Sequence, residues 1–405
     1  MIPAAWKPNR FVALLAPALA AAMAAALLVE GWSARAVQED DIATALALRP
    51  HSVPALTRGA TDAFGARRFD ASRALARAAL GQSPLNVAAM RTLGFVADHQ
   101  GKLKRAAALM NQSARLSWRD TPTQAWLFQQ ALLNNDTAAI AQRGDALLRR
   151  DQMQDSVYAA FGYLIQSDDG RAFLAQTLAY HPDWRTPFLR QLDFTTPKAA
   201  AEIIALFDTM KMNGDTPDAS ETTPFLVRLI DAGYALDAAK LTRRLNGRKA
   251  AAALLDDPDF TKAASGFNTP PFTWKIQVMT GAQPLPGTAP DGSPALAVQE
   301  DGSGADGFVT RYLGLPPGRY RLHLRVYSDS ADALDRLRAQ IQCLAPRSAL
   351  ATVKPATTAG KWIDMSDTFE VTRDCGAERI VLSLLGGGMS SDMLYLRGAA
   401  IMPVH

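Results

Sequence analysis

A spacing that recurs every 34 or 35 residues limits the fold of this chain more than any other feature. A residue, usually small, is followed seven positions later by a turn residue and five positions after that by another small residue. The copies are Gly59, Ala66 and Ala71; Gly94, Gly101 and Ala106; the degenerate Phe128, Asn135 and Ile140; and Tyr163, Gly170 and Ala175. A unit of this length cannot bury a core alone, so the pattern predicts a stacked array of helix pairs.

Each position has a physical role in a helix pair. A small residue in the first helix lets the second helix approach, and Gly or Asn at the turn adopts the left-handed conformation that ends a helix. A small residue early in the second helix then packs back, and Pro84 and Pro187 close the first and fourth units. Gly233 and Ala238 repeat the turn after an irregular insertion.

Over about residues 42–190 this pattern resembles the tetratricopeptide repeat. The resemblance implies a right-handed superhelix whose concave face binds a peptide or a partner protein. The alternative is that the helices form only a spacer, because a solenoid needs no ligand to be stable.

An apolar run from Phe11 to Val29 precedes the repeats and contains 19 residues without a charge. At about 1.5 Å per residue it would span roughly 28 Å, close to the ~30 Å core of a bilayer. It exceeds the length of about 7–15 residues usual for the apolar region of a signal peptide, so we expect a retained membrane anchor. A cleaved signal is the alternative, because Ala34-Arg35-Ala36 matches a small-x-small cleavage site.

The flanks of the run set its orientation. Lys7 and Arg10 precede it, whereas Glu30 and an acidic cluster at 39–41 follow it. The positive-inside rule places the N-terminus in the cytoplasm and exports the rest. We therefore expect a single-pass inner-membrane protein with most of the chain in the periplasm or, after cleavage, a soluble periplasmic protein.

The chain has two cysteines, Cys343 and Cys375. An even pair in an exported chain indicates one disulfide. A metal pair or a redox motif would need closer spacing or neighbouring histidines, and neither is present.

Composition changes after about residue 266. A segment rich in Gly, Pro, Thr and Asp runs to 306 and is followed by short alternating segments separated by turn residues. Six to nine strands without intervening helices predict an antiparallel sandwich. In LPPGRYRLHLRVY, Pro316-Pro317-Gly318 is the expected turn, and the inward residues are Tyr320, Leu322, Leu324 and Val326.

The predicted fold class is α+β and multidomain: a transmembrane helix, a helical solenoid and a jelly-roll-like sandwich. The expected domains are 1–41 (cytoplasmic N-terminus, anchor at about 11–29, linker), 42–262 (helical repeats) and 267–405 (sandwich).

The turn L-x-P-G-x-Y-x-L, the late strand YLRGAAI and two cysteines on neighbouring strands resemble a carbohydrate-binding module over about 267–403. The whole layout is similar to uncharacterised bacterial envelope proteins associated with polysaccharide production. The resemblance implies exposed aromatic residues that stack on sugar rings, with a place in the core as the alternative for each. The candidates for stacking are Trp362, Tyr312 and Tyr327; Tyr395 is also available, and Trp274 is expected in the core.

Motifs for other functions are absent from the sequence. Its five histidines have no paired ligand spacing, and it has no P-loop, nucleophile elbow or dinucleotide fingerprint. The net charge is only +4 without a basic stripe interleaved with aromatics, which gives nucleic-acid binding no support. The acidic clusters at 256–259 and 301–306 are interpreted as turns rather than calcium sites. We expect no metal and no cofactor.

These features predict a non-enzymatic, membrane-tethered periplasmic scaffold for assembly of the cell envelope or of exopolysaccharide. Its repeats would bind an envelope protein, and its sandwich would bind a glycan. The alternatives are a structural protein whose sandwich only caps the solenoid, and an enzyme that acts on polysaccharide.

Overall fold

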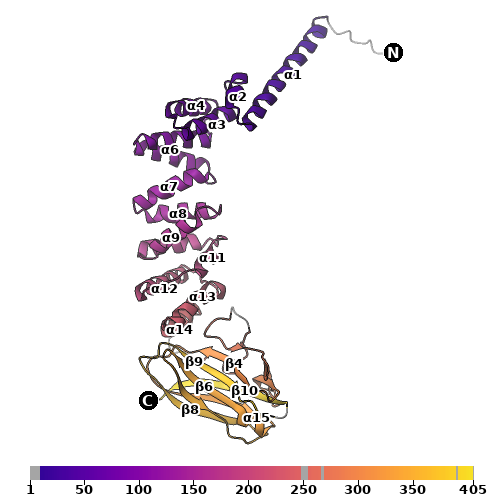
Figure 1. Cartoon of the computed structure of the whole chain (residues 1–405), viewed down its shortest axis with the longest axis vertical. Helices are drawn as coiled ribbons and strands as arrows, with labels where there is room; N and C mark the ends of the chain where they lie inside the picture. Colours follow the sequence, from indigo (N-terminus) through magenta and orange to yellow (C-terminus); the bar gives the residue numbers. More distant parts are fainter. Residues whose placement is uncertain (1–9, 248–253, 266–268, 389–390, 405) are drawn as a thin grey trace, which may run out of the picture. The chain divides into compact units, whose positions relative to one another are not determined.

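The computed structural model describes residues 10–247, 254–265, 269–388 and 391–404. The chain is α+β and multidomain, with an array of helices followed by two antiparallel sheets, as predicted (Figure 1). It divides into two compact units, Met1–Phe161 and Gly162–His405, and each is described by itself below. The change from helix to strand falls between Leu245 and Lys275. The domain limits at 41, 262 and 267 remain predictions.

Helix α1 (Arg10–Gln38) contains the one segment of the described chain that is long and apolar enough to cross a membrane, Leu19–Gln38, with a mean hydropathy of 1.2. A signal sequence near an N-terminus would have the same properties. The C-terminal end of α1 packs on the array, because Ser33 Oγ donates to the carbonyl oxygen of Ala45 at 3.1 Å and Ala36 lies in a small core with Ala45 and Ala55. Residues 1–9, which include Lys7, lie outside the described residues.

The remaining helices of the first unit follow one another at short intervals. They are α2 (Ile42–Leu48), α3 (Val53–Gly65), α4 (Phe69–Gln82), α5 (Val87–His99), α6 (Leu103–Leu116), α7 (Thr121–Leu133), α8 (Thr137–Leu148) and α9 (Gln154–Leu164), the last of which crosses the limit between the units.

The second and third copies of the repeat form as predicted. Gly101 and Asn135 adopt positive φ angles of 71° and 53° at the turns between helices. Gly94 is buried against the second helix of its pair, since a Cβ there would lie 3.0 Å from Met110 Cε. Ala106 is completely buried on that second helix. Small residues at these positions therefore allow α5 and α6 to pack closely.

The first copy is displaced by one residue from the prediction. Ala66 has φ −78°, and the left-handed residue is Arg67 with φ 57°. Ala71 is exposed, and Ser72 is buried instead, with its hydroxyl donating to the Ala60 carbonyl oxygen at 2.8 Å. The copy was placed one residue too early because Gly59, which is also buried, was taken as the small residue in place of Ala60. In addition, arginine is not a residue whose presence indicates a left-handed turn, so Arg67 could not be recognised.

The fourth copy differs at its turn. Gly170 lies inside α10 (Asp168–Leu178), and a Cβ there would lie only 2.2 Å from the carbonyl oxygen of Leu164. It therefore permits a close approach of the backbone and is not the left-handed residue that was expected. Ala175 is buried as predicted.

The second unit begins with helices and then forms the sheets. Its further helices are α11 (Arg185–Arg190), α12 (Pro197–Met212), α13 (Ala219–Asp231) and α14 (Ala235–Leu245). Gly233 between α13 and α14 has φ 85° and Ala238 is fully buried, as predicted. Arg185 is buried and its guanidinium pairs with Glu221 at 2.8 Å and with Asp215 at 2.5 Å, which joins α11 to α13 and to the segment before it.

Two five-stranded antiparallel sheets form the sandwich, in the orders β1-β4-β9-β6-β7 and β2-β3-β10-β5-β8. The strands are β1 (Lys275–Ile276), β2 (Ala282–Thr288), β3 (Pro294–Glu300), β4 (Ala305–Tyr312), β5 (Gly318–Tyr327), β6 (Leu337–Leu344), β7 (Arg347–Val353), β8 (Ile363–Val371), β9 (Glu378–Leu384) and β10 (Asp392–Pro403).

The alternating segments of the sequence correspond to seven of these strands, and β2, β3 and β7 are the ones that such a pattern did not indicate. Strands β2 and β3 lie in the segment rich in Gly, Pro, Thr and Asp. The two prolines of β2 are compatible with its position at a sheet edge, where fewer backbone N–H groups are needed. A short helix, α15 (Ala331–Arg336), interrupts the strands where no helix was expected. Its six residues are too few to show helical periodicity in the sequence.

The core lies between the two sheets. On β5, Tyr320, Leu322, Leu324 and Val326 point inward as predicted, and each is at most 6% exposed. Trp274 is 1% exposed, which confirms its expected place in the core. The other residues of β5 alternate outward on the free face of the second sheet.

The two acidic clusters lie in turns, as interpreted. Asp257 accepts the backbone N–H groups of Thr261 and Lys262 at 2.7 and 2.9 Å. Asp301 accepts the N–H of Ser303 at 2.9 Å. These carboxylates fix the conformation of the turns.

Candidate functional site

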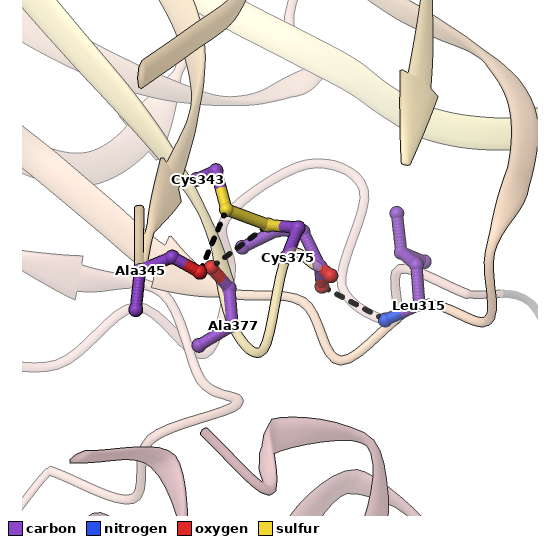
Figure 2. Close-up of a disulfide and its surroundings, with 6 residues drawn as sticks. Leu315, Cys343, Ala345, Cys375 and Ala377 are labelled. Atoms are coloured by element: carbon purple, nitrogen blue, oxygen red, sulfur yellow. Dashed lines mark hydrogen bonds between the residues drawn. A yellow bond between two sulfur atoms is a disulfide. The ribbon is translucent and has the colours of Figure 1, made fainter. Parts of the chain in front are cut away.

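The two cysteines form the predicted disulfide. Cys343 is near the end of β6, and Cys375 is in the loop between β8 and β9, with a Cα–Cα distance of 5.7 Å. Figure 2 shows the sulfurs beside the carbonyl oxygens of Ala345 and Ala377, at 3.5 and 3.4 Å. The bridge therefore ties the loop before β9 to the end of the neighbouring strand.

Leu315 lies close to this loop in Figure 2, and its N–H donates to Glu378 Oε2 at 3.0 Å. Glu378 is 2% exposed, and burial raises the pKa of its carboxyl. It has no contact with an open surface, so we interpret it as a structural acceptor.

The outward face of the second sheet carries a row of side chains that runs across the strands. The backbone pairing places Leu285 of β2 opposite Ala297 of β3, Ala297 opposite Tyr395 of β10, and Tyr395 opposite Tyr327 of β5. Trp362, directly before β8, extends the row, with its ring centroid 5.8 Å from that of Tyr327. We call Trp362, Tyr327 and Tyr395 the aromatic row.

Polar contacts hold Trp362 in place. Its indole N–H donates to Asp291 Oδ2 at 2.9 Å, and the guanidinium of Arg397 lies 4.0 Å from the ring centroid. Asp291 also accepts the hydroxyl and backbone N–H of Ser293, and these bonds with that from Trp362 lower its carboxyl pKa from 3.8 to about 2. The carboxylate is therefore charged at neutral pH and fixes one edge of the indole.

The two tyrosines are held at similar spacing. Their ring centroids are 6.1 Å apart with the planes inclined at 58°. Tyr327 donates its hydroxyl to Asp329 at 2.7 Å, and this bond raises the pKa of the phenol. All three aromatic residues are partly exposed. The row is thus an ordered apolar surface in which the polar groups of Trp362 and Tyr327 are directed into defined hydrogen bonds.

A second row of polar side chains lies two residues further along the strands, on the same face. Arg397, Arg325 and Asp364 are opposite one another on β10, β5 and β8. Asp364 is 3.2 Å from both Arg325 Nε and His323 Nε2. The positive and negative charges beside the aromatic row nearly balance, which favours a neutral ligand with many hydroxyl groups over a strongly charged one.

The structure brings together only part of the predicted stacking set. Trp362 and Tyr327 are neighbours, and Tyr395 completes the row. Tyr312 is on β4 in the opposite sheet, where it lines a hollow of about 170 Å³ with Thr222 and Arg243. It therefore does not share a face with the other two residues.

Sequence reasoning did not identify Asp291, Arg325 or Arg397 as part of this surface. Asp291-Gly292-Ser293 is a turn signal between two segments, but β2 and β3 were not recognised as strands. Without them the order of strands in the sheet, and hence these contacts with Trp362, could not be found.

No protein-family model matches the chain, so the tetratricopeptide assignment of the helices remains a prediction. No curated protein matches the sequence.

Solved structures of carbohydrate-binding modules match the C-terminal β-sandwich. TmCBM61, solved with β-1,4-galactotriose, is 14% identical with a TM-score of 0.27, covering 38% of this chain and 100% of the module. The N-terminal cellulose-binding domain of Cellulomonas fimi β-1,4-glucanase C is 20% identical with a TM-score of 0.24, over 38% and 99%. A CBM4 structure is 17% identical with a TM-score of 0.26, over 33% and 88%. The similarity extends to the fold of the sandwich alone.

Proposed function

We propose that this protein is a non-enzymatic glycan-binding protein whose sandwich binds a neutral polysaccharide on the outward face of the sheet β2-β3-β10-β5-β8. The observation that carries the proposal is the aromatic row. Three ordered rings in line offer apolar faces to sugar rings, and the adjacent arginines and aspartates can hydrogen-bond to hydroxyl groups.

The state of the Asp291 carboxylate supports binding rather than hydrolysis. A glycosidase needs one carboxyl group with a raised pKa as general acid, close to a second that stays ionised. On this face, the pKa of Asp291 is lowered and its oxygens are engaged by Ser293 and Trp362. It is therefore suited to positioning the indole.

The experiment is a binding measurement of the full chain in detergent against a panel of neutral polysaccharides. A stacking ring buries apolar surface against the sugar, and the free energy of that burial corresponds to a factor of about ten to a hundred in affinity. Trp362→Ala and Tyr327→Ala should therefore each weaken binding by about that factor. Tyr312→Ala, on the opposite sheet, is the matched control and should bind like the parent. Equal binding by all four proteins would refute the site, and shortening of the polysaccharide would show an enzyme.

A second function, capping of the helical array, has its own support in the second unit. The N–H of Ala235 at the start of α14 donates to the carbonyl oxygen of Gly376 at 3.2 Å. A Cβ on Gly314 would lie 2.6 Å from the oxygen of Ala235 and from Ala239 Cβ. The sandwich therefore covers the end of the array closely, and terminal repeats need such cover. Capping and glycan binding use different faces of the sandwich, so one does not exclude the other.

We also propose that α1 is retained as a membrane anchor, with the rest of the chain in the periplasm. The packing of Ser33 and Ala36 against the array supports retention, since cleavage after Ala36 would remove these contacts. N-terminal sequencing of the mature protein tests this, and a chain that begins at Val37 would refute it. In this setting the repeats would bind a partner protein in envelope or exopolysaccharide assembly. Co-purification of a second protein with this chain from the membrane fraction can test this.

A further inference from the structure

The positive charge of the chain is concentrated in helices α4 to α6. Between Arg67 and Arg119 there are ten Lys and Arg residues and only two acidic ones, Asp70 and Asp98, whereas the whole chain has a net charge of only +4. Eight of these cations are exposed, and no ion pair is recorded for them in the described structure. They are Arg67, Arg68, Arg77, Lys102, Lys104, Arg105, Arg115 and Arg119.

Four cations surround one hollow of about 80 Å³ in this region. Arg73 and Arg77 reach it from α4, and Lys102 and Arg105 reach it from the start of α6. Its floor is formed by buried residues of α5, including Val96 and Ala97. None of the residues that line it is acidic, and only Arg73 has an ion pair, at 3.1 Å with a highly exposed Asp70. We call this the cationic hollow.

The next repeat contains the same hollow with different chemistry. Every residue that lines the cationic hollow has its equivalent 34 positions later, in a hollow of about 400 Å³ among α6, α7 and α8. There the four cations are replaced by Ala107, Asn111, Asp136 and Ala139. The later hollow is also lined by Lys104 and Arg143, but at other positions, so the repeat forms this hollow without a cation at any of the four positions and packing does not require these four cations.

The two hollows also differ in charge at the start of the second helix of each pair, which is α6 in the cationic hollow and α8 in the later one. In the later copy Asp136 caps α8, because its carboxylate accepts the N–H of Ala139 at 3.0 Å. In the cationic hollow the equivalent residue is Lys102, whose side chain makes no such bond to α6 and instead donates to Gln100 at 3.1 Å. A carboxylate from outside would supply the negative charge that Asp136 supplies in the next repeat.

We propose that the cationic hollow binds the carboxylate groups of an acidic polysaccharide. At about 80 Å³ the hollow has room for a single planar anionic group and is too small for the large apolar side chains that anchor peptides in grooves. The unpaired cations on either side of it, from Arg67 to Arg119, suit a polymer that carries a charge at regular intervals. This site goes beyond the proposed function, because it lies on the helices and selects charged sugars.

The test measures binding of the full chain in detergent to polygalacturonate and to the same polymer after reduction of its carboxyl groups. Removing Arg77 and Arg105 together, as Arg77→Gln with Arg105→Gln, should weaken binding to polygalacturonate about tenfold at low salt. Arg150→Gln with Arg190→Gln removes the same charge from exposed positions elsewhere on the helices and should have no effect. Lys102→Asp introduces at α6 the side-chain cap that Asp136 provides at α8, so it should weaken binding to polygalacturonate while leaving α6 stable.

Binding to the reduced polymer should not respond to these substitutions, and Trp362→Ala should not change the tenfold effect of the arginines. These two measurements distinguish a failure of the proposed glycan site on the sandwich from a failure of the cationic hollow. Unchanged affinity of the Arg77 and Arg105 variant would refute the cationic hollow. If poly-glutamate or vesicles of anionic phospholipid bind as tightly with the same dependence on the two arginines, the assignment to polysaccharide is wrong.

Discussion

The disulfide leads to a prediction whose magnitude can be worked out from its position. Cys343 and Cys375 are separated by 32 residues, and the cross-link restricts that loop in the unfolded chain. On the chain-entropy relation, closing a loop of this length stabilises the folded sandwich by about 3–4 kcal/mol. Replacing both residues, as Cys343→Ser with Cys375→Ser, removes this contribution with little change in side-chain size.

Hydrogen exchange of the full chain followed by mass spectrometry measures the effect locally. Amides of β6 and β9 that exchange by opening of the sandwich should lose about 300-fold in protection, because each 1.4 kcal/mol is a factor of ten. Amides of α5 and α6 in the first unit are the internal control and should not change. The single variant Cys375→Ser should behave like the double variant, since either one breaks the bridge. A loss of less than about threefold in β6 and β9 would show that loop closure is not the source of stability.

Three further predictions concern stability and ionisation. Arg185→Met removes the buried guanidinium that pairs with Glu221 and Asp215 and should lower the unfolding free energy by about 3–5 kcal/mol in urea denaturation; a loss below about 1 kcal/mol would contradict this. Gly314→Ala should lower the thermal midpoint more than Gly360→Ala, because both have positive φ but only the first Cβ meets neighbouring atoms. The Asp291 carboxyl has a pKa lowered to about 2, so in the folded protein it stays ionised and bonded to Trp362 until pH falls through about 2, and the stability it contributes is full above pH 3.8. NMR of the indole N–H should show that transition, and Asp291→Asn should abolish it.

The sequence predicts the helical array well where its signals are local. Gly101 and Asn135 are residues that tolerate the left-handed turn, so the second and third copies were placed correctly. The first copy was misplaced by one residue because Arg67 adopts that conformation under the constraint of packing between α3 and α4. A tertiary constraint of this kind has no signature in a single sequence.

The aromatic site was only partly predictable for a related reason. Tyr327 stands out as an aromatic residue at an outward position of an alternating strand, and Trp362 as an aromatic residue next to a Gly-Lys pair. Whether two such residues are neighbours depends on the order of strands in a sheet, which is set by long-range pairing. The pairing of β10 with both β3 and β5 puts Tyr395 beside Tyr327 and brings Arg397 over Trp362. No local pattern distinguishes that order from another.

The direction of the aromatic row has a consequence for how a polysaccharide would lie across the sheet and how many protein molecules it could bind. The aromatic row runs from Tyr395 on β10 to Trp362 beside β8, and Ala297 and Leu285 continue its line across β3 to β2. Strands β2 and β8 are the two outermost strands of the sheet, and neither pairs with a further strand in the described part of the chain. A polymer lying along the row could therefore enter at one edge and leave at the other, so that internal units and not chain ends are recognised. Many molecules could then occupy one polymer side by side, and the number bound would grow with polymer length. Anchored in a membrane, such molecules would hold a long chain at many points, each contact weak and the sum nearly irreversible.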